Sequence, residues 1–453
     1  MKSINPATGA FIRRYEEISS EDLEDKLEQV SITFRDWRET SFAKRSDLMA
    51  CAARVLRDRA KEYAAIITAE MGKPITQSIA EVEKCALVCD YYAKNAEQFL
   101  ARREVESDGK QSYVRYDPIG PVLAIMPWNF PFWQVFRFAA PALMAGNVGV
   151  LKHASNVPAC ALAIEEVFRE AGFPDGVFYT LLASSDRVRS IIRDSRITAV
   201  TLTGSGPAGS QVTSIAGSAL KKTVLELGGS DPFIVLGDAD IERAAEVAAL
   251  SRTINTGQSC IAAKRFIVVR DVAEAFADAL LKNLASLTVG DPMEERTDVG
   301  PMAREDLREE LHDQVLRSVK QGARALLGGK IPEGPGFFYP ITLLTDVTAH
   351  MPVATEETFG PVAPVLVVDG VDEAIALANA SEFGLGASVW SRDLKSAHDL
   401  ARRIESGAVF VNGLVKSDPR LPFGGVKQSG FGRELSSEGI REFVNVKSVW
   451  MDP

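Results

Sequence analysis

The chain has 453 residues, of which 46% are hydrophobic and 25% are charged, and this composition is typical of a globular protein with enough apolar material for a core. Its 51 Lys and Arg against 61 Asp and Glu give a net charge of −10, which argues against a nucleic-acid scaffold because such scaffolds need clustered positive charge. It contains no apolar run of about 18 residues that could span a membrane and no apolar stretch of signal-peptide length at its start, so we expect a cytoplasmic protein.

The chain begins with a helical region. Residues 20–109 carry apolar residues at helical spacing, as in Asp47–Ala65 and Ser78–Phe99. From Gln111–Tyr116, where polar and apolar residues alternate as in an exposed strand, the pattern changes to short apolar runs separated by helical segments. The first series of runs is Val122–Met126, Val148–Leu151, Val177–Leu182, Ala199–Leu202 and Thr223–Leu227.

A second series of apolar runs begins near residue 229. Its members are Ile234–Leu236, Phe266–Val269, Ala325–Leu327, Ala363–Val368, Ala387–Trp390 and Ala408–Val411. Continuous apolar strands that alternate with helices are typical of parallel sheets covered on both faces. We therefore predict an α/β protein with two doubly wound parallel-sheet domains.

The tail Arg441–Met451 alternates like Gln111–Tyr116, and two such strands predict a small projecting sheet. Its open edge would pair with a second copy, which predicts a homodimer or a dimer of dimers.

The five cysteines are scattered, at positions 51, 85, 89, 160 and 260, and do not indicate a disulfide framework. With only four histidines and no HxxxH or CxxC spacing, we predict no metal site. Cys260 differs from the others because glycine and small polar residues precede it in Asn255–Cys260, which is typical of an accessible turn. It is either a nucleophile or a small core residue. No histidine lies near it in a motif, so a base for it would be a carboxylate.

Glu226 is the candidate base, because it ends the predicted strand Thr223–Leu227, and ligand crevices form at the carboxyl ends of such strands. Burial would raise its pKa toward neutrality, whereas the alternative is a solvated strand end. Two further groups also follow buried strands. Asn129 could donate to an oxyanion or form a local turn, and Lys152 could meet a ribose or phosphate or extend into solvent.

The segment Gly204–Gly209 fits GxGxxG after a buried strand, and its Pro207 suits the first turn of a helix. No acid that could hold a ribose lies about 20 residues further on. We therefore predict a helix start near phosphate, without the usual Rossmann geometry.

Taken together and in order, these motifs resemble the aldehyde dehydrogenase superfamily over essentially the whole chain. They are Pro127–Pro131, Lys152, Thr203–Ser205, Glu226–Gly229, Gly257–Cys260, Glu356–Pro361 and Pro422–Gly425. Within the superfamily, the chain is most similar to the short, NADP-accepting bacterial succinate-semialdehyde dehydrogenases. The resemblance implies a dinucleotide-binding domain, a catalytic domain and an oligomerisation element, which we assign to 1–109 with 119–228, to 229–428, and to 110–118 with 429–453.

The resemblance also implies a mechanism. Cys260 would attack the aldehyde, Asn129 and the backbone N–H of Cys260 would hold the oxyanion, and hydride would pass to the nicotinamide, leaving a thioester that Glu226 hydrolyses through water. Lys152 is implied at the adenosine ribose, Ser205 at the pyrophosphate, and Glu357 with Phe359 at the nicotinamide end. The full predicted cofactor set is Met126, Pro127, Trp128, Lys152, Ser155, Gly204, Ser205, Leu227, Glu357 and Phe359.

Two departures from the family pattern refine the prediction. Where NAD-preferring members have an acid three residues after the lysine, this chain has Ser155, which can hydrogen-bond a 2′-phosphate instead of repelling it. We therefore predict that NADP is used at least as well as NAD. Where some members carry a second cysteine two residues after the nucleophile, this chain has Ala262, which excludes a disulfide switch there.

The substrate pocket is predicted along Phe130–Arg137, with Phe132 and Trp133 in its wall. Arg137 would clamp a substrate carboxylate bidentately or form a surface salt bridge, and the resemblance places Ser417 at the pocket mouth. A semialdehyde acid such as succinate semialdehyde is therefore the predicted substrate. The alternatives are a broad aliphatic or aromatic aldehyde dehydrogenase, an acylating enzyme that transfers to coenzyme A, and a catalytically silent binding or structural protein. The presence of Glu226 counts against the acylating enzyme.

Overall fold

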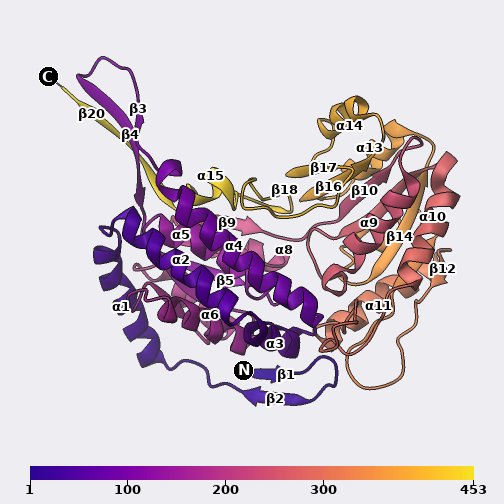
Figure 1. Ribbon diagram of the computed structural model, residues 1–453, viewed down its shortest axis with the longest axis horizontal. Coiled ribbons are helices and arrows are strands. Elements are labelled where there is room, and N and C mark those ends of the chain that lie inside the picture. The colour runs from indigo at the N-terminus through magenta and orange to yellow at the C-terminus, as the bar shows by residue number, and fades with distance from the viewer. Residues whose placement is uncertain (453) are drawn as a thin grey trace.

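A computed structural model of the chain describes residues 1–452. Figure 1 shows two α/β units side by side, with a narrow sheet projecting from the N-terminal unit. Among the helices of residues 1–452, none is both long and apolar enough to cross a bilayer.

The chain starts with a β-hairpin and four helices. The hairpin strands are β1 (Lys2–Ile4) and β2 (Phe11–Arg14), and the helices are α1 (Ser20–Trp37), α2 (Phe42–Asp58), α3 (Ala60–Met71) and α4 (Ile75–Phe99). Ser19 and Ser41 cap α1 and α2 by accepting backbone N–H groups, and α3 ends at Gly72 with a φ of 78°. The longest helix, α4, buries one face in the core and delivers side chains toward the cleft between the units.

The first unit contains a six-stranded sheet in the order β19-β9-β8-β5-β6-β7, parallel except for β19. Its strands are β5 (Pro121–Met126), β6 (Val148–His153), β7 (Phe178–Thr180), β8 (Ala199–Thr203), β9 (Lys222–Glu226) and β19 (Gly430–Phe431). The helices that follow its strands are α5 (Trp133–Met144), α6 (Pro158–Glu170), α7 (Val188–Arg193) and α8 (Gly206–Ser218). The chain order reverses between β5 and β8, and ligand crevices form at such a switch point.

The second unit contains a seven-stranded sheet in the order β12-β13-β14-β11-β10-β16-β17, in which only the β12–β13 pair is antiparallel. Its strands are β10 (Asp231–Val235), β11 (Ala263–Val269), β12 (Arg324–Leu327), β13 (Thr342–Thr345), β14 (Val362–Val368), β16 (Gly386–Trp390) and β17 (Ala408–Val411). Its helices are α9 (Ile241–Thr253), α10 (Arg270–Ala285), α11 (Glu305–Lys320), α12 (Pro352–Thr355), α13 (Val371–Asn379) and α14 (Leu394–Ala401). The α/β fold class and the two largely parallel sheets are as predicted.

The projecting sheet has three antiparallel strands in the order β20-β4-β3, namely β20 (Val444–Met451), β4 (Gln111–Pro118) and β3 (Arg103–Glu104). The short strands β15 (Phe383–Gly384) and β18 (Val426–Lys427) pair elsewhere, and α15 (Ser436–Ile440) precedes β20.

One local expectation was wrong. Residues 100–109 are not helical, because Arg103 and Glu104 pair with β4 and form β3. Strand β13 was not predicted from the sequence. The predicted domain boundaries stay a prediction.

Candidate active site

Cys260 lies on a loop between α9 and β11, at the edge of the second sheet that faces the first. The loop contains three consecutive residues with left-handed backbone, Asn255 (φ 56°), Thr256 (φ 57°) and Gly257 (φ 73°). Only glycine fits at the third, because a Cβ there would lie 2.4 Å from the backbone of Gly360. Thr256 is held by hydrogen bonds between its hydroxyl and the backbone of Gly300, at 3.1 and 3.3 Å. The loop is therefore rigidly fixed by distant segments.

Burial and the nearby positive charges shift the pKa of the Cys260 thiol in opposite directions. The thiol is half-buried, and burial raises its pKa to about 11, although the charges of Lys264 and Arg137 act in the opposite direction. Lys264 is fully buried and donates to the carbonyl oxygens of Ser259 and Cys260, at 2.9 and 2.6 Å. It also forms an ion pair with Glu357 at 3.1 Å. The raised pKa favours the protonated thiol at rest, and the positive charges of Lys264 and Arg137 favour negative charge on its sulfur.

Asn129 follows β5 and lies opposite this loop. It is buried, and its Nδ2 donates to the carbonyl oxygen of Gln258 at 3.0 Å. The side chain of Asn255 donates to the carbonyl oxygen of Asn129 at 2.7 Å, which joins the two segments. The structure therefore brings Asn129 and Cys260 to one place, as the sequence predicted.

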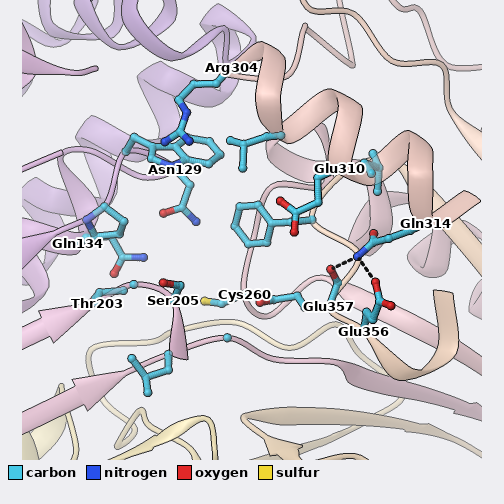
Figure 2. A pocket seen from close by; sticks show the side chains of 18 residues that line it. Asn129, Gln134, Thr203, Ser205, Cys260, Arg304, Glu310, Gln314, Glu356 and Glu357 are labelled. Carbon is cyan, nitrogen blue, oxygen red and sulfur yellow. Dashed lines mark hydrogen bonds between the residues drawn. The ribbon is translucent and has the colours of Figure 1, made fainter. Parts of the chain in front are cut away.

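Cys260 separates two cavities. The larger, of about 580 Å³, also contains Asn129 and Glu357 in its lining, and Figure 2 shows these three side chains directed into it. The smaller, of about 100 Å³, lies on the other side of the thiol, toward Trp133 and Ser417. One reactive sulfur is therefore accessible from a large and from a small cavity.

The larger cavity contains most of the predicted cofactor residues. Those in its lining are Pro127, Trp128, Gly204, Ser205, Leu227, Glu357 and Phe359. Ser205 precedes α8 and makes no side-chain capping bond, so N–H groups of the first turn are left free for an anion. Gly209 packs on Leu227 so closely that a Cβ would lie 2.6 Å from it, which explains the last glycine of the motif. Met126 is buried behind this wall, so the structure does not bring its side chain to the cavity.

Two further contacts shape the far end of this cavity. Glu357 accepts a hydrogen bond from the backbone N–H of Gly229 at 3.0 Å, in addition to its ion pair with Lys264. Phe359 meets Trp128 edge to face, with ring centroids 5.8 Å apart. These contacts hold the predicted nicotinamide-end residues in place.

Lys152 and Ser155 line a third cavity, of about 430 Å³, together with Ser184 and Ser185. Burial lowers the pKa of Lys152, while the negative charge of Glu17, which lines the same cavity, raises it. Within residues 1–452, Lys152 makes no ion pair, so its ammonium and the surrounding hydroxyls are free to bind an anionic group. Glu17 is the one acid in this lining and would oppose such a group.

Glu226 ends β9, as predicted, but it is buried and does not line either cavity at Cys260. Neither of its carboxylate oxygens has a hydrogen-bond partner among residues 1–452. Burial raises its pKa well above the usual range, and the neighbouring carboxylate of Glu434 adds to this, while Arg137 and Arg433 oppose it. A carboxylate with a raised pKa is a stronger base than an ordinary one, which suits general-base chemistry.

Arg137 lies on α5 and lines the smaller cavity, but it is only 1% exposed. Its guanidinium forms an ion pair with Glu434, donates to the Thr203 hydroxyl at 3.4 Å and stacks 4.5 Å from the ring centroid of Phe423. Its charge is thus largely matched from within the protein, and its role as a substrate clamp stays a prediction.

Ser417 and Trp133 also line the smaller cavity, and the indole N–H of Trp133 donates to the Ser417 hydroxyl at 3.1 Å. Phe132 does not reach it. Because α5 begins at the next residue, Phe132 turns into the core, where it packs on Tyr63 and Phe136.

Three residues of this region were not predicted from the sequence: Lys84, Lys264 and Glu434. Lys84, from α4, lines the smaller cavity and donates to Ser417 at 2.8 Å. Lys264 follows the nucleophile by four residues, so its position in the sequence was a usable signal. The other two come from segments that the motifs do not include.

The chain is similar to known proteins over nearly its whole length. The model of the aldehyde dehydrogenase family matches residues 1–449. A probable NADP-dependent succinate-semialdehyde dehydrogenase of Synechocystis is 54% identical over 99% of each chain, and a succinate semialdehyde dehydrogenase of Escherichia coli named as using NAD(P)⁺ is 50% identical over 99% of this chain and 97% of its own. The crystal structure of succinic semialdehyde dehydrogenase from Streptococcus pyogenes in complex with NADP⁺ superimposes with a TM-score of 0.97 at 38% identity, over the full length of both chains.

Proposed function

The chain belongs to the aldehyde dehydrogenase family, and from this we propose that it oxidises succinate semialdehyde to succinate with NADP or NAD as hydride acceptor. The observation that carries the proposal is the position of Cys260 between a large cavity with an uncapped helix start and a small cavity with cationic walls. A large cavity of this kind suits a dinucleotide, and a small cationic one suits a short aldehyde that carries a carboxylate.

In the first half of the proposed reaction, the Cys260 thiol loses its proton to solvent water and its sulfur bonds to the aldehyde carbon, which converts the carbonyl oxygen into an oxyanion. The backbone N–H of Cys260 and the amide of Asn129 donate to that oxygen. Lys264 and Arg137 favour the thiolate, since both lower the pKa of the thiol. The resulting thiohemiacetal holds the aldehyde hydrogen toward the larger cavity.

The residues that line the larger and the third cavity support a dinucleotide site. We propose that Ser205 and the first turn of α8 hold the pyrophosphate, Lys152 and Ser155 the adenosine ribose and its 2′-phosphate, and Glu357 with Phe359 the nicotinamide end. When bound, the nicotinamide accepts the hydride that leaves the thiohemiacetal carbon. The predicted order of NADP over NAD depends on Ser155, because an acid there would repel the extra phosphate.

In the second half, water attacks the thioester while the carboxylate form of Glu226 takes one proton of that water. Glu226 returns this proton to the sulfur as the C–S bond breaks, which releases succinate and the Cys260 thiol. Glu226 lies outside both cavities, so its carboxyl group must turn toward Cys260 for this step. In its buried resting position, burial and the carboxylate of Glu434 raise its pKa, whereas the charge of Arg137 lowers it.

We propose that the projecting sheet joins two copies of the chain. Strand β20 lies at one end of the three-stranded sheet with its outer edge free, and Val446 and Trp450 on it are exposed. A homodimer or a dimer of dimers is expected, and light scattering coupled to size-exclusion chromatography measures the mass directly.

The function is tested by following reduced-nicotinamide absorbance with a panel of aldehydes, each supplied with NADP and with NAD. The proposal expects the highest kcat/KM with succinate semialdehyde and NADP. Equal kcat/KM for succinate semialdehyde, butanal and benzaldehyde would instead indicate a broad aldehyde dehydrogenase. No reduction with any aldehyde would indicate a silent binding protein.

A further inference from the structure

Lys84 is a cation in the substrate cavity without a carboxylate partner. Its side chain leaves α4 and lines the smaller cavity beside Cys260. The ammonium donates to the Ser417 hydroxyl at 2.8 Å and lies 4.1 Å from the ring centroid of Trp133. Both contacts orient a positive charge, and neither neutralises it. No acid among residues 1–452 forms an ion pair with it.

The other charges around Lys84 are already engaged. From the same helix, Glu81 pairs with Lys73 and accepts the backbone N–H groups of Phe132 and Trp133 at 2.9 and 3.0 Å. From the loop after Ser417, Asp418 pairs with Arg420 at 2.6 Å. From α5, Arg137 adds a second positive charge. The thiol of Cys85, also on α4, is buried and has a raised pKa, so it stays neutral.

Arg137, which the sequence analysis proposed as the substrate clamp, already has a carboxylate partner, unlike Lys84. The carboxylate of Glu434 offsets its charge, and the ring of Phe423 covers it. A second anion would have to compete with Glu434 for that guanidinium. The smaller cavity has one more lysine in its lining, Lys416, but that residue is exposed to solvent, so the unpaired positive charge in the more buried part of the wall is that of Lys84.

We propose that Lys84 is the principal counter-charge for the substrate carboxylate and sets the preference for semialdehyde acids, with Ser417 as a second donor. This inference rests on the proposed function. A cavity of about 100 Å³ with Cys260 at one end and Lys84 at its wall admits only a short chain between aldehyde and carboxylate. Burial and the charge of Arg137 lower the pKa of Lys84 to about 8, so its ammonium is present at neutral pH and lacks the anion that would stabilise it.

The test compares succinate semialdehyde with butanal, an uncharged aldehyde of equal length, in the full-length protein with saturating NADP. The variants are Lys84→Met, which removes charge and donor, Lys84→Gln, which keeps a donor, and Lys94→Met, a matched loss of an exposed lysine from the same helix. For Lys84→Met we expect a KM for succinate semialdehyde that is roughly 10- to 150-fold higher, the range for a lost hydrogen bond to a charged group. Lys84→Gln should raise the KM for succinate semialdehyde nearly as much, and the KM for butanal should change little in both variants. Lys94→Met should match the parent.

Different results would overturn the proposed substrate and the proposed role of Lys84. If the parent protein does not prefer succinate semialdehyde over butanal, the proposed substrate is wrong, and the role of Lys84 is overturned with it. If the parent prefers the semialdehyde but Lys84→Met weakens both substrates equally, Lys84 is merely structural and only this inference is overturned. The thermal midpoint without ligands separates a folding defect from a binding defect. We expect Lys84→Met to be at least as stable as the parent, because it removes an uncompensated cation, and a large loss of stability would contradict the inference.

Discussion

Replacing Arg137 with Met should destabilise the protein more than any other single change at the site. Arg137 is 1% exposed and Glu434 is 5% exposed, and the two form an ion pair next to the carboxyl group of Glu226. Removing one partner of a buried pair costs about 3–5 kcal/mol, because it leaves the other charge without compensation. Met fills a similar volume, so the cavity contribution is small.

The loss of stability in Arg137→Met should depend on pH, and the pKa shifts give its direction. Arg137 lowers the pKa of both Glu226 and Glu434, so both values rise further when it is removed. A carboxyl group with a folded-state pKa above its unfolded value costs no stability at low pH, and its cost grows as the pH rises toward the folded-state pKa. The deficit of Arg137→Met should therefore be smallest in acid and largest at alkaline pH.

Urea unfolding measures the free energy of unfolding at each pH. It is applied to the parent, Arg137→Met, Glu434→Gln and the double variant. We expect the double variant to recover most of the loss, because replacing both members of a buried pair is often nearly neutral. A loss below about 1 kcal/mol at every pH, with no recovery in the double variant, would refute the reasoning. The same variant tests the substrate clamp predicted from the sequence, which requires the KM for succinate semialdehyde to rise while that for butanal does not.

Three further predictions concern the chemistry. Cys260→Ala should abolish aldehyde oxidation and leave NADP binding intact by fluorescence titration, and turnover within roughly tenfold of the parent would exclude Cys260 as the nucleophile. Glu226→Gln should give a burst of reduced cofactor followed by slow steady turnover, because the thioester forms but is not hydrolysed, and a steady rate equal to that of the parent across neutral pH would assign the base to another group. Ser155→Glu should shift the ratio of kcat/KM values from NADP toward NAD by repelling the 2′-phosphate beside Lys152, and a parent enzyme that accepts only NAD would contradict this reading of the third cavity.

The sequence predicted those features that local patterns specify. Buried parallel strands are continuous apolar runs, so the ends of β5, β6, β8 and β9 were predicted to within two residues. Side chains at the carboxyl ends of these strands meet at one edge, and this reasoning singled out Asn129 and Glu226. Cys260, which precedes β11, was assigned to the same site only through the family resemblance. The antiparallel pair β12–β13 was harder to find, because β13 is only four residues long and follows a loop rich in glycine and proline.

The features of the site that were not predicted from the sequence depend on contacts between distant segments. Lys84 resembles any solvated lysine of an amphipathic helix until Ser417, which lies 333 residues further along the chain, meets it. The pairing of Arg137 with Glu434 is equally remote, so a buried ion pair could not be distinguished from a free clamp. Phe132 and Trp133 are neighbours in sequence but face opposite directions, and the start of α5 decides which of them reaches the cavity.

The left-handed loop before Cys260 has a consequence for the protein during its synthesis. The loop takes its shape from contacts with Gly300 and Gly360, both of which leave the ribosome after the cysteine itself. Translation proceeds at about 5–20 residues per second, so several seconds separate the emergence of the thiol from that of the segments that position it. During that time Cys260 is an ordinary cysteine on a flexible nascent chain, with no oxyanion donors arranged around it. A prematurely terminated polypeptide that ends before Gly300 therefore contains the nucleophile but lacks both of the contacts that shape its loop.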